Sequence, residues 1–331
     1  MEVIIGAGAV GGTLAAHLLR AGFKVAFVVP AGRAEHYRGI NTLHLSRVRG
    51  KPWLFPAPPV HTNLTRLHPQ HVYVAVKYRD LATVTAQLER DLAPGIPIFS
   101  CLNGITAVPY LQSRLPNNPV HHLTILYNAA RLEPMHYVLT TRPMALLEGD
   151  EPELRRALSR AGLRLGRGGA DAALGKLLIN INNAICALTD KTFGDMLRER
   201  PLKQAFTLTL DEAVQTLQDA GMTFKLPVPV PYSIYRWIGL HAGSLPYWLG
   251  RLSGSLSIQA YPSMVADIHA GKSTEVDQLN GTIVGIGRQH HLPTPVNMRI
   301  VELVKDLERQ HPPRYLTADE LLRQLKSAAR S

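Results

Sequence analysis

The chain has 331 residues, of which 46% are hydrophobic and 18% are charged, and this composition excludes a disordered or low-complexity protein. Two cysteines exclude a disulfide framework; Cys101 and Cys186 lie in apolar runs and are expected to be buried thiols. The formal charge of +11 favours anionic partners, but without a basic block or metal-ligand spacing we expect neither nucleic acid nor a metal.

The first half of the chain alternates apolar, β-branched runs with helical patterns. Strands are predicted at 2–8, 24–29, 71–77, 96–104 and 121–130, and helices at 9–22, 81–92, 105–115 and 151–162. This alternation is typical of a doubly wound parallel sheet of the α/β class. The segment 135–149 is expected to add an antiparallel ribbon near the end of that sheet.

From about Asp171 onward the periodic segments are helical. Helices are expected at 175–188, 201–221, 274–291, 295–311 and 317–330, the last with a capping box of Thr317 and Glu320. The irregular segment 226–263 is rich in proline, glycine and aromatic residues, and is expected to fill a core or an interface or to line a pocket. We therefore predict an N-terminal Rossmann-type domain, residues 1–167, and a C-terminal all-helical domain, residues 168–331.

A predicted strand begins at residue 2, which leaves no room for a signal peptide before it. No apolar run reaches the roughly 18 residues that would suggest a membrane span. The expectation is a cytoplasmic, soluble protein that does not contact a membrane.

The segment VIIGAGAVGG, residues 3–12, carries the spacing Gly6-x-Gly8-x-x-Gly11 between a predicted strand and a predicted helix. In this context the first glycine makes a tight turn, the second admits a pyrophosphate and the third lets the helix pack on the strand. The phosphates would meet free N–H groups at the positive end of the helix dipole. The predicted dinucleotide-binding residues are Gly6, Ala7, Gly8, Ala9, Val10 and Gly11.

The second strand ends in FVVPAGR, with no acidic residue before Glu35. NAD sites usually place a carboxylate there to bind the ribose hydroxyls, and a carboxylate would repel a 2′-phosphate. Its absence, together with Arg33, favours NADP(H) as the cofactor.

The run GKLLININNAICAL, residues 175–188, is apolar except for one lysine and three asparagines. At 3.6 residues per turn, Lys176, Asn180 and Asn183 fall on one narrow stripe of a helix that should otherwise be buried. Buried amides and ammonium groups need hydrogen-bonding partners, so we expect the stripe to face a ligand. The alternative is a snorkelling lysine with amides bonded to neighbouring helices.

Two further motifs complete a pattern. CLNGI puts Asn103 at the carboxyl end of a predicted strand, and SMVADIHAGKSTEVDQLNG, residues 263–281, forms a helical region spotted with polar residues. With the glycine spacing and KLLIN, these motifs resemble the ketopantoate reductase (2-dehydropantoate 2-reductase) family over nearly the whole chain. The resemblance implies an NADP-dependent reduction of a small 2-oxo acid, most directly ketopantoate to pantoate in pantothenate biosynthesis.

The resemblance also implies catalytic roles. Lys176 would be the general acid that protonates the carbonyl oxygen as hydride arrives from the nicotinamide, Asn103 would lie between cofactor and substrate, and Glu275 would pair with the cofactor. An ammonium group suits this role because negative charge develops on the carbonyl oxygen during hydride transfer.

The remaining matched residues would bind ligands. Asn180 and Ser263 would hold the substrate, and Asn183 could replace an asparagine that the family usually has at Ala184. The side chain of Lys77 and the backbone of Ala130 would contact the cofactor.

Gly194 and Val29 also depart from the family pattern, the first where a substrate-binding asparagine is usual and the second where a basic residue commonly marks the 2′-phosphate. These changes leave a bulkier 2-oxo acid open as substrate. A non-catalytic sensor of NADP(H) and a 3-hydroxy acid dehydrogenase are alternatives, and the run STEVDQLNG favours the reductase over the dehydrogenase. A homodimer formed through the helical domain is a further alternative, because segment 226–263 is rich in apolar and aromatic residues.

Overall fold

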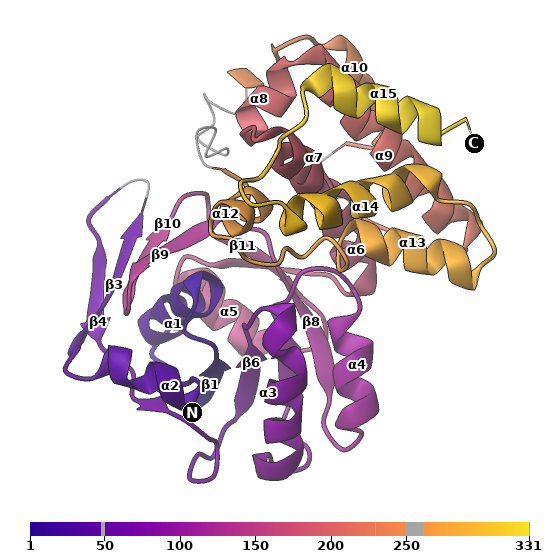
Figure 1. Cartoon of the computed structure of the whole chain (residues 1–331). Helices are drawn as coiled ribbons and strands as arrows, with labels where there is room; N and C mark the ends of the chain where they lie inside the picture. Colours follow the sequence, from indigo (N-terminus) through magenta and orange to yellow (C-terminus); the bar gives the residue numbers. More distant parts are fainter. Residues whose placement is uncertain (48–49, 229, 246, 249–260, 331) are drawn as a thin grey trace. The chain divides into compact units, whose positions relative to one another are not determined.

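The structure is a computed structural model that describes the chain except residues 48–49, 229, 246, 249–260 and 331 (Figure 1). The chain separates into two compact units, Met1–Ala170 and Asp171–Ser331. The boundary predicted from the sequence, between residues 167 and 168, falls after the last strand of the first unit and before the first helix of the second.

The first unit is built on an eight-stranded sheet with helices on both faces, which confirms the predicted α/β class. Across the sheet the strands are β12 (Arg164–Arg167), β11 (Met144–Leu147), β8 (Val120–Ile125), β7 (Ile98–Ser100), β6 (His71–Val74), β1 (Glu2–Ile5), β2 (Val25–Val28) and β5 (Val60–His61). Neighbouring strands are parallel except β8 and β11, which are antiparallel. The register aligns Ile5 with Val28 and Val74, so β1, β2 and β6 end at the same edge.

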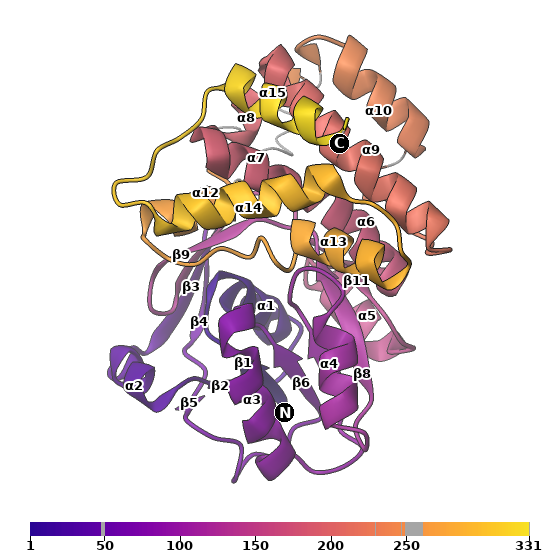
Figure 2. The ribbon, with the colours of Figure 1, turned by 45° about the vertical axis from the view of Figure 1, so that its right-hand side comes forward.

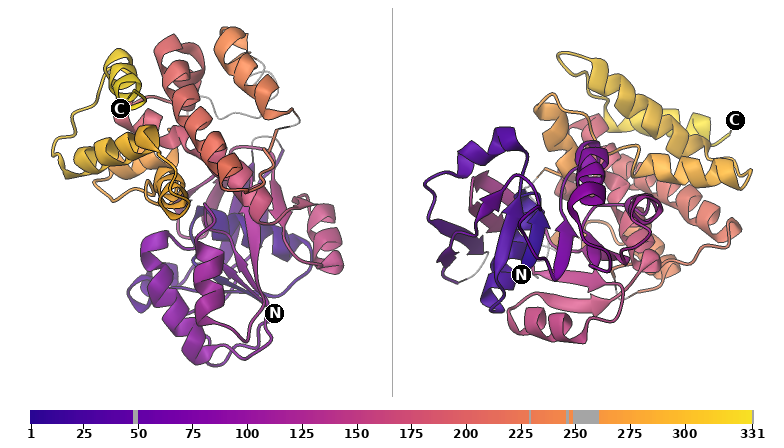
Figure 3. Two further views of the ribbon diagram at one scale, coloured as in Figure 1. Left: turned by 90° about the vertical axis from the view of Figure 1, so that its right-hand side faces the viewer. Right: turned by 90° about the horizontal axis from the view of Figure 1, so that it is seen from below.

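Helices α3 (Tyr78–Asp91) and α4 (Ala107–Arg114) lie side by side against one face of this sheet (Figures 2 and 3). Helices α1 (Ala9–Arg20) and α5 (Pro152–Arg160) pack against the other face. In β1, Val3 and Ile5 join the core under α3 and α4, whereas Ile4 joins the core under α1 and α5. Because helices cover both faces of the sheet, the central strands are continuous apolar runs in the sequence.

A second, four-stranded sheet packs on α1, and the sequence did not predict it. Its order is β4 (Trp53–Pro56), β3 (Thr42–Arg47), β10 (His136–Leu139) and β9 (Ala129–Glu133). The prediction of one strand at 121–130 was therefore wrong, because β8 and β9 belong to different sheets. The predicted ribbon at 135–149 was also wrong, because β10 pairs with β3 and β9 whereas β11 joins the main sheet.

The second unit is all-helical in its described part, as predicted. Its helices are α6 (Ala170–Asn180), α7 (Asn182–Thr189), α8 (Phe193–Arg198), α9 (Arg200–Asp219), α10 (Tyr232–His241), α12 (Ser263–His269), α13 (Asn280–Gln289), α14 (Pro295–Arg309) and α15 (Ala318–Ala328). Helix α14 packs against α7, α9, α13 and α15 (Figure 2). The predicted capping box opens α15, with reciprocal hydrogen bonds between Thr317 and Glu320.

Three predictions about this unit need correction. The run 175–188 is divided at Ile181 into α6 and α7, and the helix expected at 274–291 begins only at Asn280. The irregular segment 226–263 contains α10, while its residues 229, 246 and 249–260 lie outside the described part of the chain.

The stretch Ala170–Thr189 is long and apolar enough, by length and composition, to cross a membrane, so the expectation that no such run exists was wrong. Its most apolar window is 78% buried inside the protein, which is the behaviour of a core helix. Cys186 lies in this buried stretch. Both Cys186 and Cys101 are buried free thiols, as predicted. Burial raises the pKa of Cys186 to about 12, so this thiol stays protonated near neutrality.

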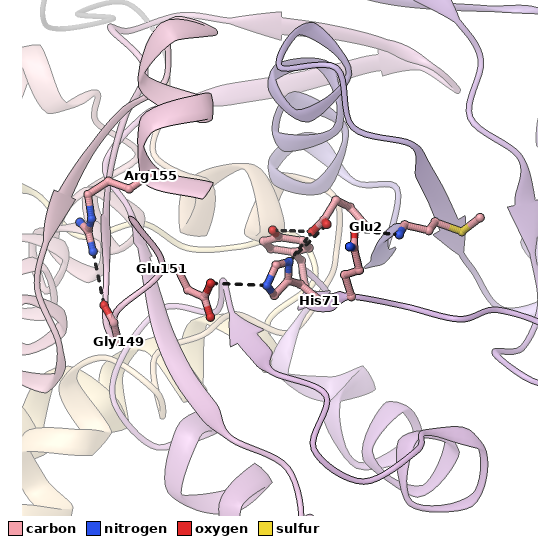
Figure 4. Close-up of polar contacts among 8 residues, drawn as sticks. Glu2, His71, Gly149, Glu151 and Arg155 are labelled. Carbon is pink, nitrogen blue, oxygen red and sulfur yellow. Dashed lines mark hydrogen bonds and ion pairs between the residues drawn. The ribbon is translucent and has the colours of Figure 1, made fainter. Parts of the chain in front are cut away.

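The amino ends of the central strands carry a polar cluster (Figure 4). The carboxylate of Glu2 is fully buried and accepts hydrogen bonds from Tyr73 at 2.8 Å and from His71 Nδ1 at 3.0 Å. Glu151 lies 3.7 Å from the other ring nitrogen of His71. Burial alone would lower the pKa of His71, but the hydrogen bond and charge of Glu2, with the charge of Glu151, raise it overall. Sheets of this class bind ligands at the carboxyl ends of their strands. This cluster lies at the amino ends, so we interpret it as a part of the fold and not of the ligand site.

Candidate active site

The glycine-rich turn joins β1 to α1 at the carboxyl end of the sheet. Gly6 has a φ of 102°, and a Cβ there would lie 2.7 Å from the carbonyl oxygen of Ala75. A Cβ on Gly11 would overlap the carbonyl oxygen of Gly6, so only glycine lets α1 start so close to the turn. At Gly8, in contrast, no described atom lies within 4 Å of a Cβ. The turn is closed toward the protein and open at the position expected to meet a pyrophosphate.

Three buried tyrosines bind the carbonyl groups of this turn. The hydroxyls of Tyr37 and Tyr137 donate to the carbonyl oxygen of Ala7, at 3.4 and 3.3 Å, and Tyr127 donates to that of Val10 at 3.2 Å. Burial raises the pKa of Tyr127 and of Tyr137, so both remain donors. These tyrosines could not be predicted from the sequence, because no local pattern connects them to the turn.

The start of α1 is free of competing negative charge. Gly8 is its N-cap, no side chain caps the helix, and its first turn contains no acidic residue. The first N–H groups of a helix have no intrahelical partner, and they lie at the positive end of the helix dipole. With the carbonyls of Ala7 and Val10 held by hydroxyls, these residues fit the phosphates of a dinucleotide.

The segment after β2 has no carboxylate until Glu35. Val29 is buried at the end of the strand, and Arg33 is exposed on the short helix α2 (Ala31–Ala34). Glu35 is engaged by Arg38 at 2.8 Å. Between Val29 and Ala34 the described segment therefore carries one basic side chain, Arg33, and no acidic one.

Two further predicted cofactor residues follow neighbouring strands. Lys77 follows β6 as the N-cap residue of α3, and Asn103 follows β7, which pairs with β6. The carbonyl oxygen of Asn103 accepts a hydrogen bond of 2.6 Å from the hydroxyl of Tyr78, which fixes the backbone after β7. The first unit thus brings the glycine turn, Lys77 and Asn103 to one edge of the sheet. Ala130 lies on β9 of the second sheet and is exposed.

In the second unit, the polar stripe is the accessible side of a buried helix pair. Between residues 172 and 189 every residue is buried except Lys176, Ile179, Asn180 and Asn183, which are half-buried. Their spacing of three, four and seven residues from Lys176 places them on one face. The polar side chains thus gather on the one side of the helix pair that stays accessible. Ala184 is fully buried and points to the core instead.

Helix α12 places Ser263 near the same helix pair. Ser263 is the exposed first residue of α12, which packs against α7. At the other end of α12, Nε2 of His269 lies 2.8 Å from Oδ1 of Asp190, the C-cap residue of α7. This pair fastens α12 to α7, the helix that carries Asn183.

Glu275 lies in the turn 274–279, and side chains of α14 hold this turn on both sides. The carboxylate of Glu308 accepts hydrogen bonds from the backbone N–H of Thr274 at 2.8 Å and from its hydroxyl at 2.6 Å. The ammonium group of Lys305 lies 2.6 Å from Asp277 Oδ2. Burial lowers the pKa of Lys305, but Asp277 and Glu308 raise it overall, so the ammonium stays charged.

The end of the turn is anchored inside the protein. Asn280 is fully buried and donates from its side-chain amide to Oδ1 of Asn297 on α14 at 3.0 Å. Asn297 in turn donates to Glu212 of α9 at 2.9 Å. The turn is therefore defined by side chains that come from distant parts of the chain. Among the described residues, no group of three or more His, Cys, Asp or Glu side chains could hold a metal ion.

Family comparisons match both units. The model described as "Ketopantoate reductase PanE/ApbA" matches residues 3–149, and the model of the C-terminal part of the same family matches residues 170–308. A 2-dehydropantoate 2-reductase of Aquifex aeolicus is 24% identical over 92% of this chain and 96% of its own. A 2-dehydropantoate 2-reductase of Halobacterium salinarum is 24% identical over 82% of this chain and 90% of its own.

Solved structures share the fold. A ketopantoate reductase of Ralstonia eutropha superposes with a TM-score of 0.77 at 23% identity, covering 93% of this chain and 98% of its own. D-mandelate dehydrogenase, solved with NADH and anilino(oxo)acetate, gives 0.75 at 19% identity with the same coverage. Since the two family models together span most of both units, the chain belongs to the ketopantoate reductase family of oxidoreductases.

Proposed function

We propose that this protein is an NADP-dependent reductase that converts a small 2-oxo acid, with ketopantoate the favoured substrate, to the 2-hydroxy acid. The polar stripe of Lys176, Asn180 and Asn183 carries the proposal, because these are the polar side chains left accessible between residues 172 and 189 of the buried helix pair. The relatives named 2-dehydropantoate 2-reductase support this substrate. In this proposal residues 1–167 hold the cofactor and residues 168–331 hold the substrate.

NADPH, when bound, supplies the hydride. Lys176 donates a proton to the carbonyl oxygen of the substrate and offsets the negative charge that develops there. Asn180, Asn183 and Ser263 hold the carboxylate and hydroxyl groups of the substrate, because amides and hydroxyls both donate and accept without adding charge. Asn103 lies between the substrate and the cofactor and orients one relative to the other.

The cofactor is held mainly by the first unit. Residues 6–11 bind the pyrophosphate, where the uncapped start of α1 and the open space at Gly8 support the fit. Lys77, Ala130 and Glu275 make further contacts. Arg33 favours a 2′-phosphate because no carboxylate precedes Glu35 in the segment after β2, and Glu35 is paired with Arg38.

A bulkier 2-oxo acid is the second candidate substrate. Ala184 and Gly194 stand at positions where an amide would bind ketopantoate, and both are buried. The structural neighbour D-mandelate dehydrogenase, solved with anilino(oxo)acetate, is named for an aromatic substrate. Comparing turnover of ketopantoate with that of phenylglyoxylate separates the two candidates.

We also propose a cytoplasmic protein that assembles through its helical unit. Ile234 and Trp237 on α10 are 47% and 59% exposed, which is unusual for large apolar side chains. A neighbour from Staphylococcus aureus is described as a dimeric ketopantoate reductase. The oligomeric states of the wild-type protein and of Trp237→Ser test the assembly through α10. If both form an equally stable dimer, α10 has no role in it.

The central test is NADPH oxidation with ketopantoate by the wild-type protein and by Lys176→Ala. For a general acid, we expect turnover to fall by roughly 10²- to 10⁴-fold. The matched control is Lys326→Ala, which removes an exposed lysine from α15 and should leave turnover unchanged. Undiminished turnover in Lys176→Ala would contradict the mechanism, and tight NADPH binding without turnover of any 2-oxo acid would indicate a sensor.

A further inference from the structure

A guanidinium group lies one hydrogen bond away from a tyrosine that holds the glycine-rich turn. Nη1 of Arg131 donates to the hydroxyl oxygen of Tyr37 at 3.1 Å, and the same hydroxyl donates to the carbonyl oxygen of Ala7 at 3.4 Å. Arg131 lies on β9, Tyr37 ends the 3-10 helix η1 (Glu35–Tyr37) after β2, and Ala7 lies in the turn. Three distant segments of the chain therefore meet at this point.

The arrangement gives the arginine a defined direction. Tyr37 is only 7% exposed, so its ring is fixed, whereas Arg131 itself is exposed. The hydroxyl accepts from the guanidinium and donates to the carbonyl, which uses both of its functions at once. One end of Arg131 is thus held against the wall of the predicted cofactor site.

The charge of Arg131 is not neutralised within the described part of the chain. Its guanidinium has the one hydrogen bond to Tyr37 and forms no ion pair with a described carboxylate. Glu35, at the start of the same short helix as Tyr37, is engaged by Arg38. A planar guanidinium with unused N–H donors favours a phosphate as partner.

The position indicates which phosphate. In folds of this class the pyrophosphate binds the start of the first helix, and the adenosine ribose lies between the glycine turn and the end of the second strand. Tyr37 and Ala7 come from those two segments, and neither a carboxylate nor a basic residue stands at the strand end, where Val29 is buried. We infer that Arg131, together with Arg33, binds the 2′-phosphate of NADP(H). This inference rests on the proposed function and adds a specificity residue to it.

A purely structural role for Arg131 makes a different prediction. If Arg131 only supported Tyr37, its loss would disturb the glycine turn and weaken the binding of NADPH and NADH alike. A ligand of the 2′-phosphate affects NADPH alone, because NADH has a hydroxyl at that position. The two dinucleotides therefore separate the two roles.

The test is a fluorescence titration of the full-length protein with NADPH and with NADH. We expect Arg131→Ala to weaken NADPH binding about 10- to 100-fold, as for loss of a charged hydrogen bond, and to change NADH binding less than about 2-fold. Arg131→Lys keeps the charge and should restore part of the NADPH affinity. Tyr37→Phe leaves the arginine without its support and should cause a smaller loss, again for NADPH.

The matched control is Arg66→Ala, which removes an exposed arginine from the connection that enters β6 at the amino end of the sheet. It should change neither affinity. Equal losses for both dinucleotides in Arg131→Ala, or no loss for NADPH, would overturn the inference. A wild-type protein that binds neither dinucleotide would overturn the proposed function as well, whereas NADPH-dependent turnover with an unaffected Arg131→Ala would overturn the inference alone.

Discussion

The glycine-rich turn of the first unit and the Glu275 turn of the second are built by opposite means. In the first, the backbone sets the shape: Gly6 adopts a φ closed to other residues, and Gly11 allows contact that a side chain would block. In the second, side chains set the shape: Glu308 and Lys305 of α14 hold Thr274 and Asp277 on either side of Glu275. A turn of the first kind can be recognised from local spacing, whereas a turn of the second kind depends on side chains of a helix that follows it in the chain, such as Glu308, 34 residues after Thr274.

The largest effect is expected from Gly11→Ala, because the added Cβ would overlap the carbonyl oxygen of Gly6. Overpacking of this kind should lower the free energy of unfolding by roughly 1–3 kcal/mol and abolish dinucleotide binding. Urea unfolding and an NADPH titration measure the two quantities. Gly8→Ala is the control, since its Cβ would enter open space and should reduce binding while leaving stability within about 1 kcal/mol of wild type. Equal destabilisation by both variants would show that the turn is not shaped by the backbone.

An intermediate effect is expected from Glu308→Gln. This change weakens the two hydrogen bonds that Thr274 donates to residue 308, without changing the size of the side chain. Hydrogen bonds to a charged group contribute roughly 1.5–3 kcal/mol, so the turn should loosen while the fold persists. We expect the KM for NADPH to rise about 10-fold, with little change in the KM for the 2-oxo acid.

The control for this variant lies on the same helix. Glu302→Gln removes an exposed partner of Arg299 and should leave both KM values unchanged. If Glu308→Gln lowered only thermal stability, with the NADPH KM unaltered, the α14 contacts would be supports of the fold and not of Glu275.

A smaller effect is expected from Tyr137→Phe, which removes one of the two hydroxyls bound to the carbonyl of Ala7. A neutral hydrogen bond contributes about 0.5–1.5 kcal/mol, and the hydroxyl of Tyr37 remains in place. The stability should fall by that amount in urea unfolding, and NADPH affinity should fall less than about 5-fold. A loss as great as that of Gly11→Ala would mean that side chains, not glycines, define this turn.

The smallest effect is a pH dependence at the opposite end of the same strands. The pKa of His71 is raised in the folded protein, so its pairing with Glu2 stabilises the fold fully below the unfolded pKa of about 6.5. That contribution is lost as the pH rises through the folded pKa of His71. Urea unfolding between pH 6 and 8 should show stability declining with pH, and His71→Gln should flatten this decline. A matching pH dependence of NADPH binding would show that the two ends of the sheet are not independent.

The comparison of the two turns also shows what the sequence could predict. The α/β class and the tight backbone geometry at Gly6 and Gly11 followed from apolar runs and glycine spacing, because the physical causes are local. The turn at Glu275 was predicted as part of a helix over residues 274–291, which in the structure begins only at Asn280. Thr274 donates its backbone N–H and its hydroxyl to Glu308. These hydrogen bonds hold the segment as a turn and leave no mark in the local sequence.

The second sheet was missed for a similar reason. Its strands β3 and β4 are short and partly exposed, and β3 pairs with β10, whose residue His136 aligns with His44 from far earlier in the chain. The polar stripe was predicted in its angular position but not in its exposure, since Ile181 interrupts the helix and Ala184 turns inward. Contacts between distant segments account for the second sheet and for the turn at Glu275.

The second sheet has a consequence for the way a ligand is met. Helix α1 lies between the two sheets, and eight consecutive residues, Gly11 to Leu18, are buried. A helix enclosed in this way exchanges its amide protons slowly and has no room to shift when a ligand arrives. Nucleotide binding should therefore require no rearrangement at the start of α1. Any conformational change should occur in the nucleotide and in the loops around it.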